Sequence, residues 1–412
     1  MKRISVLMFA AFVDMLGFAI IFPLLPYYAL RLDAQEWMVG WLIASFSIAK
    51  LVSAPWWGRL SDRYGRRPII IIALSTSAIA FFVFGFASSL WVLFLSRVIQ
   101  GLGGGTTGVL QAYIGDAFDR KDRTKALGWL TASTSAGVMI GPAIGSLAFG
   151  FGPAAPGLVA GFLCVLNVAF AWKLLPESTP PDFAGTGETK ARRAGPTQSI
   201  RSAMWQVLKN PGHEVSLLIW IYTVGILGFI STTGVLVLYL QSDFAVTETT
   251  IGLFFVYVGA MGVVMRALVL GKLVDWLGEI KVMRLGAILL MLGILLIAIP
   301  DSIIPLALIW ALIPIGTACL FPAVAASVTH RVSDSEFGQS LGVQQAFGGV
   351  ARVNGPIWAT AVFQGVGAAV PFFIASGIVA VSVVLTFLVH EHPDGVTPAE
   401  VKQQEPIPLK AP

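Results

Sequence analysis

Twelve apolar segments, each about 20 residues long, alternate with short polar loops along almost the whole chain. A helix of this length crosses the hydrocarbon core of a bilayer, which is about 30 Å thick. A composition of 56% hydrophobic and 12% charged residues also leaves too little polar surface for a water-soluble domain. We therefore predict an all-α integral membrane protein with 12 transmembrane helices, at 4–28, 39–57, 69–88, 91–114, 126–150, 156–175, 215–240, 251–271, 284–300, 302–328, 338–363 and 370–389.

Lysine and arginine are distributed unequally between the two sides of these spans. If the N-terminus is cytoplasmic, 22 of the 27 basic residues lie in cytoplasmic segments and one, Arg31, lies on the other side. Short loops rich in Lys and Arg remain in the cytoplasm during membrane insertion. We therefore predict cytoplasmic N- and C-termini. The net charge of +5 then reflects topology, and we expect no nucleic-acid partner.

Similar sequences recur in the two halves of the chain. The segment GRLSDRYGRR at 58–67 returns in weaker form as GKLVDWLG at 271–278, and the Gly-Pro pair at 141–142 returns at 355–356. Internal repeats around a midplane binding site are typical of secondary transporters. We predict two pseudo-symmetric six-helix bundles at 1–175 and 214–390, joined by a cytoplasmic linker at 176–213 and followed by a cytoplasmic tail at 391–412.

The segment at 58–67 resembles the loop 2–3 signature of the major facilitator superfamily, G-x-L-[AS]-D-[RK]-x-G-[RK]-[RK], at every specified position. In that family the aspartate and the first arginine join an acidic residue at the cytoplasmic end of helix 4, and the network locks the halves in the outward-open state. The resemblance therefore implies a conformational latch made of Gly58, Asp62, Arg66, Arg67 and Asp116. The alternative is that these loop charges only determine topology.

Three further segments resemble the drug–proton antiporters of this superfamily. RVIQGLG, which starts at Arg97, is similar to the helix 4 motif R-x-x-Q-G-x-G, which the family links to proton coupling. The segment 14–26 resembles the first helix of tetracycline-type exporters, and GVMIGPAIG resembles the helix 5 antiporter signature through Gly137, Gly141, Pro142 and Gly145. Structural alternatives are an arginine that snorkels outward or bonds backbone carbonyls, and a helix 5 that serves only for packing.

Charged residues inside the predicted spans are candidates for the transport chemistry. Asp14 is the only acidic one and lies about 15 Å deep, because ten residues rise 1.5 Å each. A carboxyl group removed from water takes up a proton more easily, so it can change charge during a transport cycle. We predict that Asp14 and Arg97 couple transport to protons. The alternative for Asp14 is a permanent ion pair with Lys50 or Arg97.

The basic residues inside the spans outnumber this single acid, since Lys50, Arg97, Arg266 and Arg352 all lie within them. This excess indicates a substrate with an anionic or strongly polar hydrogen-bond-accepting group. Alternatively, Arg352 bonds helix carbonyls or Asn354 and Gln345 on the same helix. We predict a substrate cavity that contains Asp14, Lys50, Gln100, Gln111, Gln345, Arg352 and Asn354.

These features predict a transporter rather than an enzyme. We expect it to export a small amphipathic molecule or drug in exchange for protons, by alternating access in a bacterial inner membrane, as tetracycline and multidrug exporters do in drug efflux and antibiotic resistance. We expect no metal, no catalytic residue and no cofactor, with the proton as coupling ion. The expected partners are a small-molecule substrate, protons and the lipid bilayer, and the expected state is a monomer. Alternatives are a proton-coupled symporter or facilitator for an anionic or polar metabolite, and a non-transporting membrane receptor or scaffold.

Overall fold

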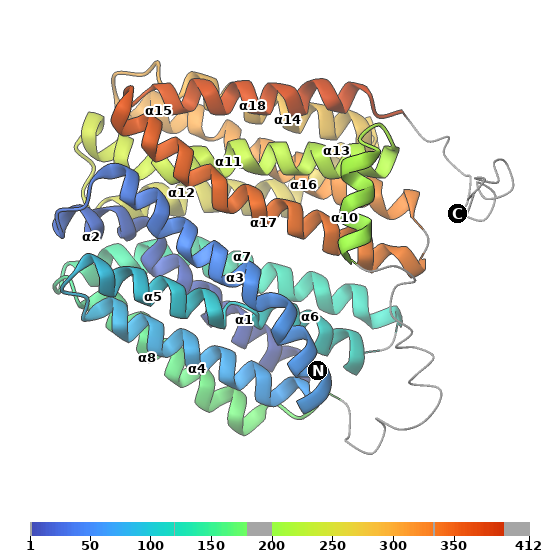
Figure 1. Ribbon diagram of the computed structural model, residues 1–412, viewed down its shortest axis with the longest axis horizontal. Helices are drawn as coiled ribbons and strands as arrows, with labels where there is room; N and C mark the ends of the chain where they lie inside the picture. Colours follow the sequence, from blue (N-terminus) through green and yellow to red (C-terminus); the bar gives the residue numbers. More distant parts are fainter. Residues whose placement is uncertain (1, 119, 179–199, 333, 391–412) are drawn as a thin grey trace, which may run out of the picture.

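The computed structural model describes residues 2–118, 120–178, 200–332 and 334–390, and these residues form helices and connecting turns without a strand (Figure 1). One bundle contains α1 (Lys2–Ile21), η1 (Phe22–Leu24), α2 (Leu25–Arg31), α3 (Glu36–Tyr64), α4 (Arg66–Gly85), α5 (Leu90–Gly103), α6 (Thr106–Ala117), α7 (Arg120–Phe149) and α8 (Ala155–Leu174). The second bundle contains α11 (Glu214–Phe244), α12 (Ile251–Val264), η3 (Met265–Val269), α13 (Leu270–Leu277), α14 (Glu279–Leu296), α15 (Ile303–Trp310), α16 (Leu312–Arg331), α17 (Asp334–Gly365) and α18 (Val370–Phe387). The short helix α10 (Ile200–Lys209) packs on α11 and α17.

All twelve predicted spans coincide with helices. In the part of the chain that the structure describes, nine helical segments are long and apolar enough to cross a membrane. The remaining three predicted spans are α5–α6, which is interrupted at Gly104 and Gly105, α14, which begins with a stretch that contains three charged residues, and α17, which is rich in glycine and glutamine. The protein is therefore a multi-pass membrane protein. Most of the predicted linker and the whole predicted tail, 179–199 and 391–412, lie outside the described residues.

The backbone confirms that the two charged repeat segments are equivalent. Gly65 separates α3 from α4 with φ 95° and ψ 159°, and Gly278 separates α13 from α14 with φ 80° and ψ 159°. Residues with a side chain rarely adopt a positive φ of this kind, so glycine is required at both turns. The same sharp turn therefore joins the corresponding helices of the two bundles.

The glycines of the helix 5 motif bring α7 into close contact with α1. A methyl group on Gly137 would meet the carbonyl of Phe12, and one on Gly145 would overlap the carbonyl of Ile20. Gly141 faces Ala19 in the same way. Helices in membranes approach closely where small residues line their interface, so this motif fixes α7 against the helix that bears Asp14.

The two bundles are joined mainly through the pairs α3–α17 and α7–α12. Near one end, which we call the Arg31 end (residues 31–40 and 243–252), Arg31 forms an ion pair with Glu248 at 2.8 Å. Tyr27 donates a hydrogen bond to the carbonyl of Val246 at 2.8 Å. In Figure 1 the two groups of helices lie together at this end and diverge towards the other, which we call the basic end (residues 58–67 and 271–281).

Candidate functional site

A cavity of about 640 Å³ lies between the two bundles. Helices α1, α3, α5 and α7 of the first bundle and α11, α12 and α17 of the second contribute to its wall. Most of the lining is apolar, with six aromatic side chains: Phe18, Phe22, Phe46, Phe229, Phe255 and Trp310. A concave, mainly apolar space with a few polar groups is the usual form of a small-molecule site.

The charged residues that line this cavity are all basic. Lys50 comes from α3, Arg97 from α5 and Arg352 from α17, and Gln345 adds an amide. No aspartate or glutamate is among the described residues of the wall. Three helices from both bundles thus direct hydrogen-bond donors to one apolar space, so the cavity favours amphipathic molecules that carry hydrogen-bond acceptors.

Arg352 is held by a residue that the sequence did not single out. Its Nη2 donates a hydrogen bond to the hydroxyl of Tyr222 on α11 at 3.2 Å. Asn354 instead donates to the carbonyl of Val350 on its own helix, at 2.9 Å. The expected alternative partner Asn354 therefore does not hold Arg352. Nothing about Tyr222 in an apolar span distinguishes it from a packing residue before the helices are assembled.

Arg97 is almost completely buried, with 2% of its surface exposed. Its guanidinium lies over the ring of Phe84 at 5.2 Å, and its Nε and Nη2 have no hydrogen-bond partner within the described ranges. A buried cation without hydrogen bonds is unfavourable. A polar group that enters the cavity and accepts hydrogen bonds from Arg97 would remove part of this cost.

Asp14 is also buried, but it does not belong to the cavity wall. Its carboxyl group lies beside Ser77 on α4 and interacts electrostatically with Lys50. Lys50 in turn interacts with Asp14 and with Arg352. Lys50, a basic residue of the cavity wall, is thus also the residue that interacts electrostatically with the predicted coupling residue.

The structure places three of the seven predicted cavity residues, Lys50, Gln345 and Arg352, in the wall. The other four lie elsewhere. Asp14 and Gln100 are buried within the first bundle, whereas Gln111 and Asn354 are exposed. Depth along a helix can be counted from the sequence, but the direction in which each side chain points depends on how the helices pack.

Truncation of Arg352 tests whether this residue binds substrate. Arg352→Ala should weaken substrate binding by about 10- to 100-fold, the range expected for a lost hydrogen bond to a charged group. Thermal stability should change little by comparison, and Arg352→Lys should recover only part of the affinity because lysine lacks the planar fork. Binding titrations and thermal unfolding of the same samples provide the measurement.

Arg266→Ala is the matched control, since Arg266 lies in a span but outside the cavity wall. Unchanged binding in Arg352→Ala would remove Arg352 from the site.

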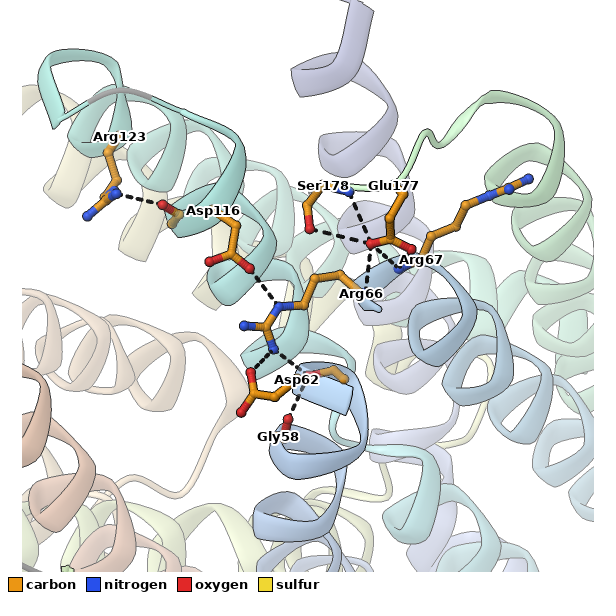
Figure 2. A network of polar contacts seen from close by, with 10 residues as sticks. Gly58, Asp62, Arg66, Arg67, Asp116, Arg123, Glu177 and Ser178 are labelled. Atoms are coloured by element: carbon orange, nitrogen blue, oxygen red, sulfur yellow. Dashed lines mark hydrogen bonds and ion pairs between the residues drawn. The ribbon is translucent and has the colours of Figure 1, made fainter. Parts of the chain in front are cut away.

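At the basic end, the predicted network is assembled around Arg66 (Figure 2). Its Nη1 lies 2.7 Å from Asp62 Oδ1, and its Nε lies 2.8 Å from Asp116 Oδ2. The hydroxyl of Ser61 accepts a further hydrogen bond from Arg66 and donates to the carbonyl of Gly58 at 2.8 Å. Residues from α3, α4 and α6 thus meet as the motif implies, and all of them belong to the first bundle.

Glu177 completes this network and was missed by sequence reasoning. Its carboxylate accepts hydrogen bonds from the backbone N–H of Arg66 at 2.8 Å and of Arg67 at 3.3 Å, at the first turn of α4 (Figure 2). A negative group is favourable at a helix N-terminus, where backbone donors are free. Arg67 donates to the carbonyl of Trp172 at the end of α8. Since Glu177 lies 111 residues from Arg66, no local sequence signal connects them.

Two helical bundles around a central cavity, with a charged network at one end, have the architecture of a secondary transporter.

Comparison with known proteins identifies the family. The chain matches the sequence profile described as Major Facilitator Superfamily over residues 7–303 and 218–411. It is 27% identical to Multidrug resistance protein 1 of Bacillus subtilis (strain 168), over 93% of this chain and 95% of the relative. It is 28% identical to the class G tetracycline resistance protein of Vibrio anguillarum, over 85% and 88%. The crystal structure of the human organic anion transporter MFSD10 covers 93% of this chain and 99% of its own, with a TM-score of 0.70 at 21% identity, which shows a shared fold. The chain belongs to the major facilitator superfamily.

Proposed function

We propose that this protein exports small amphipathic molecules across a bacterial inner membrane in exchange for protons. The observation that carries the proposal is the aromatic-lined cavity of about 640 Å³ between the two bundles. A multidrug resistance protein and a tetracycline resistance protein are similar to the chain over most of its length, which supports drug efflux. A protein of this kind is not an enzyme, because it moves its substrate without chemical change.

We place the basic end in the cytoplasm, because Lys and Arg concentrate there. The Arg31 end then faces the outside, and the contacts between Arg31 and Glu248 and between Tyr27 and Val246 close it. The described conformation is accordingly closed to the outside. Export requires a second conformation in which these contacts separate and the basic ends come together.

A second function in the same fold is favoured by the basic wall of the cavity. Three cations without an acidic residue would suit a symporter or facilitator that takes up an anionic metabolite. A drug-accumulation assay in cells that lack their own efflux pumps distinguishes export from uptake. Expression should lower the accumulation of tetracycline or ethidium, and a protonophore should restore it. Unchanged drug accumulation together with faster uptake of organic acids would favour the symporter.

Asp62→Asn tests the latch. The Asp62–Arg66–Asp116 network is already formed in the described conformation, within the first bundle. We propose that it fixes the surface on which the second bundle docks when the basic ends come together in the outward-open state. The variant should therefore increase the inward-open population and reduce transport while the protein remains folded. Because Asp62 is 61% exposed, we expect an effect of at most about 1 kcal/mol, or roughly a fivefold change in the population ratio. Distances between spin labels at the basic ends of the two bundles measure it.

The neighbouring Arg63→Gln is the control, because Arg63 stacks on Tyr64 and is not part of the network. It should leave the distance distribution unchanged. Impaired transport of Asp62→Asn with an unaltered distance distribution would contradict the latch.

A further inference from the structure

Lys50 occupies a special position between the buried acid and the cavity. Its ammonium lies 5.7 Å from the centre of the Phe46 ring, within the cavity wall, while it also interacts electrostatically with Asp14. Its aliphatic stem packs beside Gly104, where a methyl group would come within 3.2 Å of Cδ. The stem is therefore fixed against the α5–α6 junction, and only the flexible end of the side chain is left to respond to the charge of Asp14.

We infer that Lys50 transmits the charge of Asp14 to the cavity. This inference rests on the proposed exchange of substrate for protons. When Asp14 is ionised, its carboxylate draws the ammonium of Lys50 towards α1 and leaves the ring of Phe46 free for substrate. When Asp14 is protonated, the ammonium loses this counter-ion and occupies the ring face inside the cavity. Proton and substrate then exclude each other, as antiport requires, although the substrate never touches Asp14.

The surrounding groups favour this assignment. Around Asp14, α4 contributes Ser77 and α8 contributes the thiol of Cys164, and neither carries a positive charge that would replace Lys50. Helix α7, which packs most closely on α1, has no charged residue between 126 and 149. Asp14 therefore depends on Lys50 for its counter-charge.

Around Lys50, the other charged groups repel it. Arg352 on α17 interacts with it unfavourably, and Arg97 on α5 lines the same cavity. Without ionised Asp14, the ammonium has no acidic partner in the wall, and an aromatic face is the remaining favourable contact. A cation over an aromatic ring gains about 0.5–2 kcal/mol. Competition for the Phe46 face can therefore change substrate affinity by about 2- to 30-fold.

A double-variant experiment distinguishes relay through Lys50 from direct contact between Asp14 and substrate. Binding to purified protein is measured across the mildly acidic to mildly alkaline range with tetracycline and ethidium as fluorescent probes. In the unmodified protein, affinity should fall about tenfold on acidification. Asp14→Asn should bind weakly at every pH, Lys50→Met should bind tightly at every pH, and the combined variant should also bind tightly at every pH.

Weak binding by the combined variant, equal to that of Asp14→Asn, would overturn the inference, because Asp14 would then contact the substrate itself. Unaltered pH dependence in Lys50→Met would overturn it as well. Lys50→Arg retains the charge and should retain the pH dependence, which guards against a folding defect in Lys50→Met. The matched control is Lys173→Met at an exposed helix end, which should keep the original profile. If the unmodified protein binds neither probe, the proposed export of such molecules is wrong. This outcome differs from one in which the unmodified protein binds the probes but Lys50 does not transmit the charge of Asp14.

Discussion

Asp14→Asn is expected to abolish concentrative transport driven by a pH gradient. Asparagine mimics the permanently protonated acid, so the cycle can no longer release a proton on the cytoplasmic side. With one proton exchanged per substrate, each unit of pH difference supports about tenfold accumulation in the unmodified protein, because that free energy is about 1.4 kcal/mol. The variant should reach no accumulation above equilibrium, while downhill exchange can persist. Substrate uptake into vesicles under an imposed pH gradient measures the difference.

Asp14→Glu is the matched variant, since it keeps a titrating group at the same position and should keep partial coupling. Asp14 is the only acidic residue near the middle of a predicted span, so no other carboxylate of similar depth can replace it. Normal accumulation by Asp14→Asn would contradict its role. The coupling would then have to depend on Asp116 at the basic end or on the membrane potential.

Gly40→Ala is expected to destabilise the described conformation strongly. Gly40 on α3 faces the backbone of Pro356 and the hydroxyl of Thr360 on α17, and a methyl group there would overlap both. Overpacking of this kind costs about 1–3 kcal/mol, which lowers the population closed at the Arg31 end by roughly five- to a hundredfold relative to the open one. Spin labels on α2 and on the loop before α12 should therefore report longer distances, and transport should fall with them.

Gly377→Ala provides the control, because a methyl group at Gly377 on α18 meets no atom within 4 Å. This variant should retain both the distances and the transport rate. If Gly40→Ala showed unchanged distances and full activity, close contact between α3 and α17 would not be what closes the Arg31 end.

Much of this architecture follows from local sequence features. Hydropathy located the spans because each helix must satisfy its backbone hydrogen bonds inside the bilayer on its own. The repeat was recognisable because Gly65 and Gly278 meet the same backbone requirement in both halves. The motif also brought together Asp62 and Arg66, since both flank a turn of fixed geometry, whereas Asp116 on α6 was expected from the family resemblance.

Features that depend on how helices rotate and pack were not accessible from the sequence. Tyr222 holds Arg352 across 130 residues, and Glu177 caps α4 across 111 residues. Asp14 lies behind the cavity wall rather than in it.

Proton movement coupled to substrate movement is the most direct test of the proposed antiport. Inside-out vesicles containing the protein would be given an acidic interior, and tetracycline or ethidium would be added outside. We predict that substrate accumulates in the vesicles, that the interior becomes more alkaline as it does so, and that both effects vanish when an ionophore removes the pH gradient. Accumulation of the same size with and without the pH gradient would contradict exchange of substrate for protons. Accumulation that occurs only when the interior is alkaline would contradict it as well.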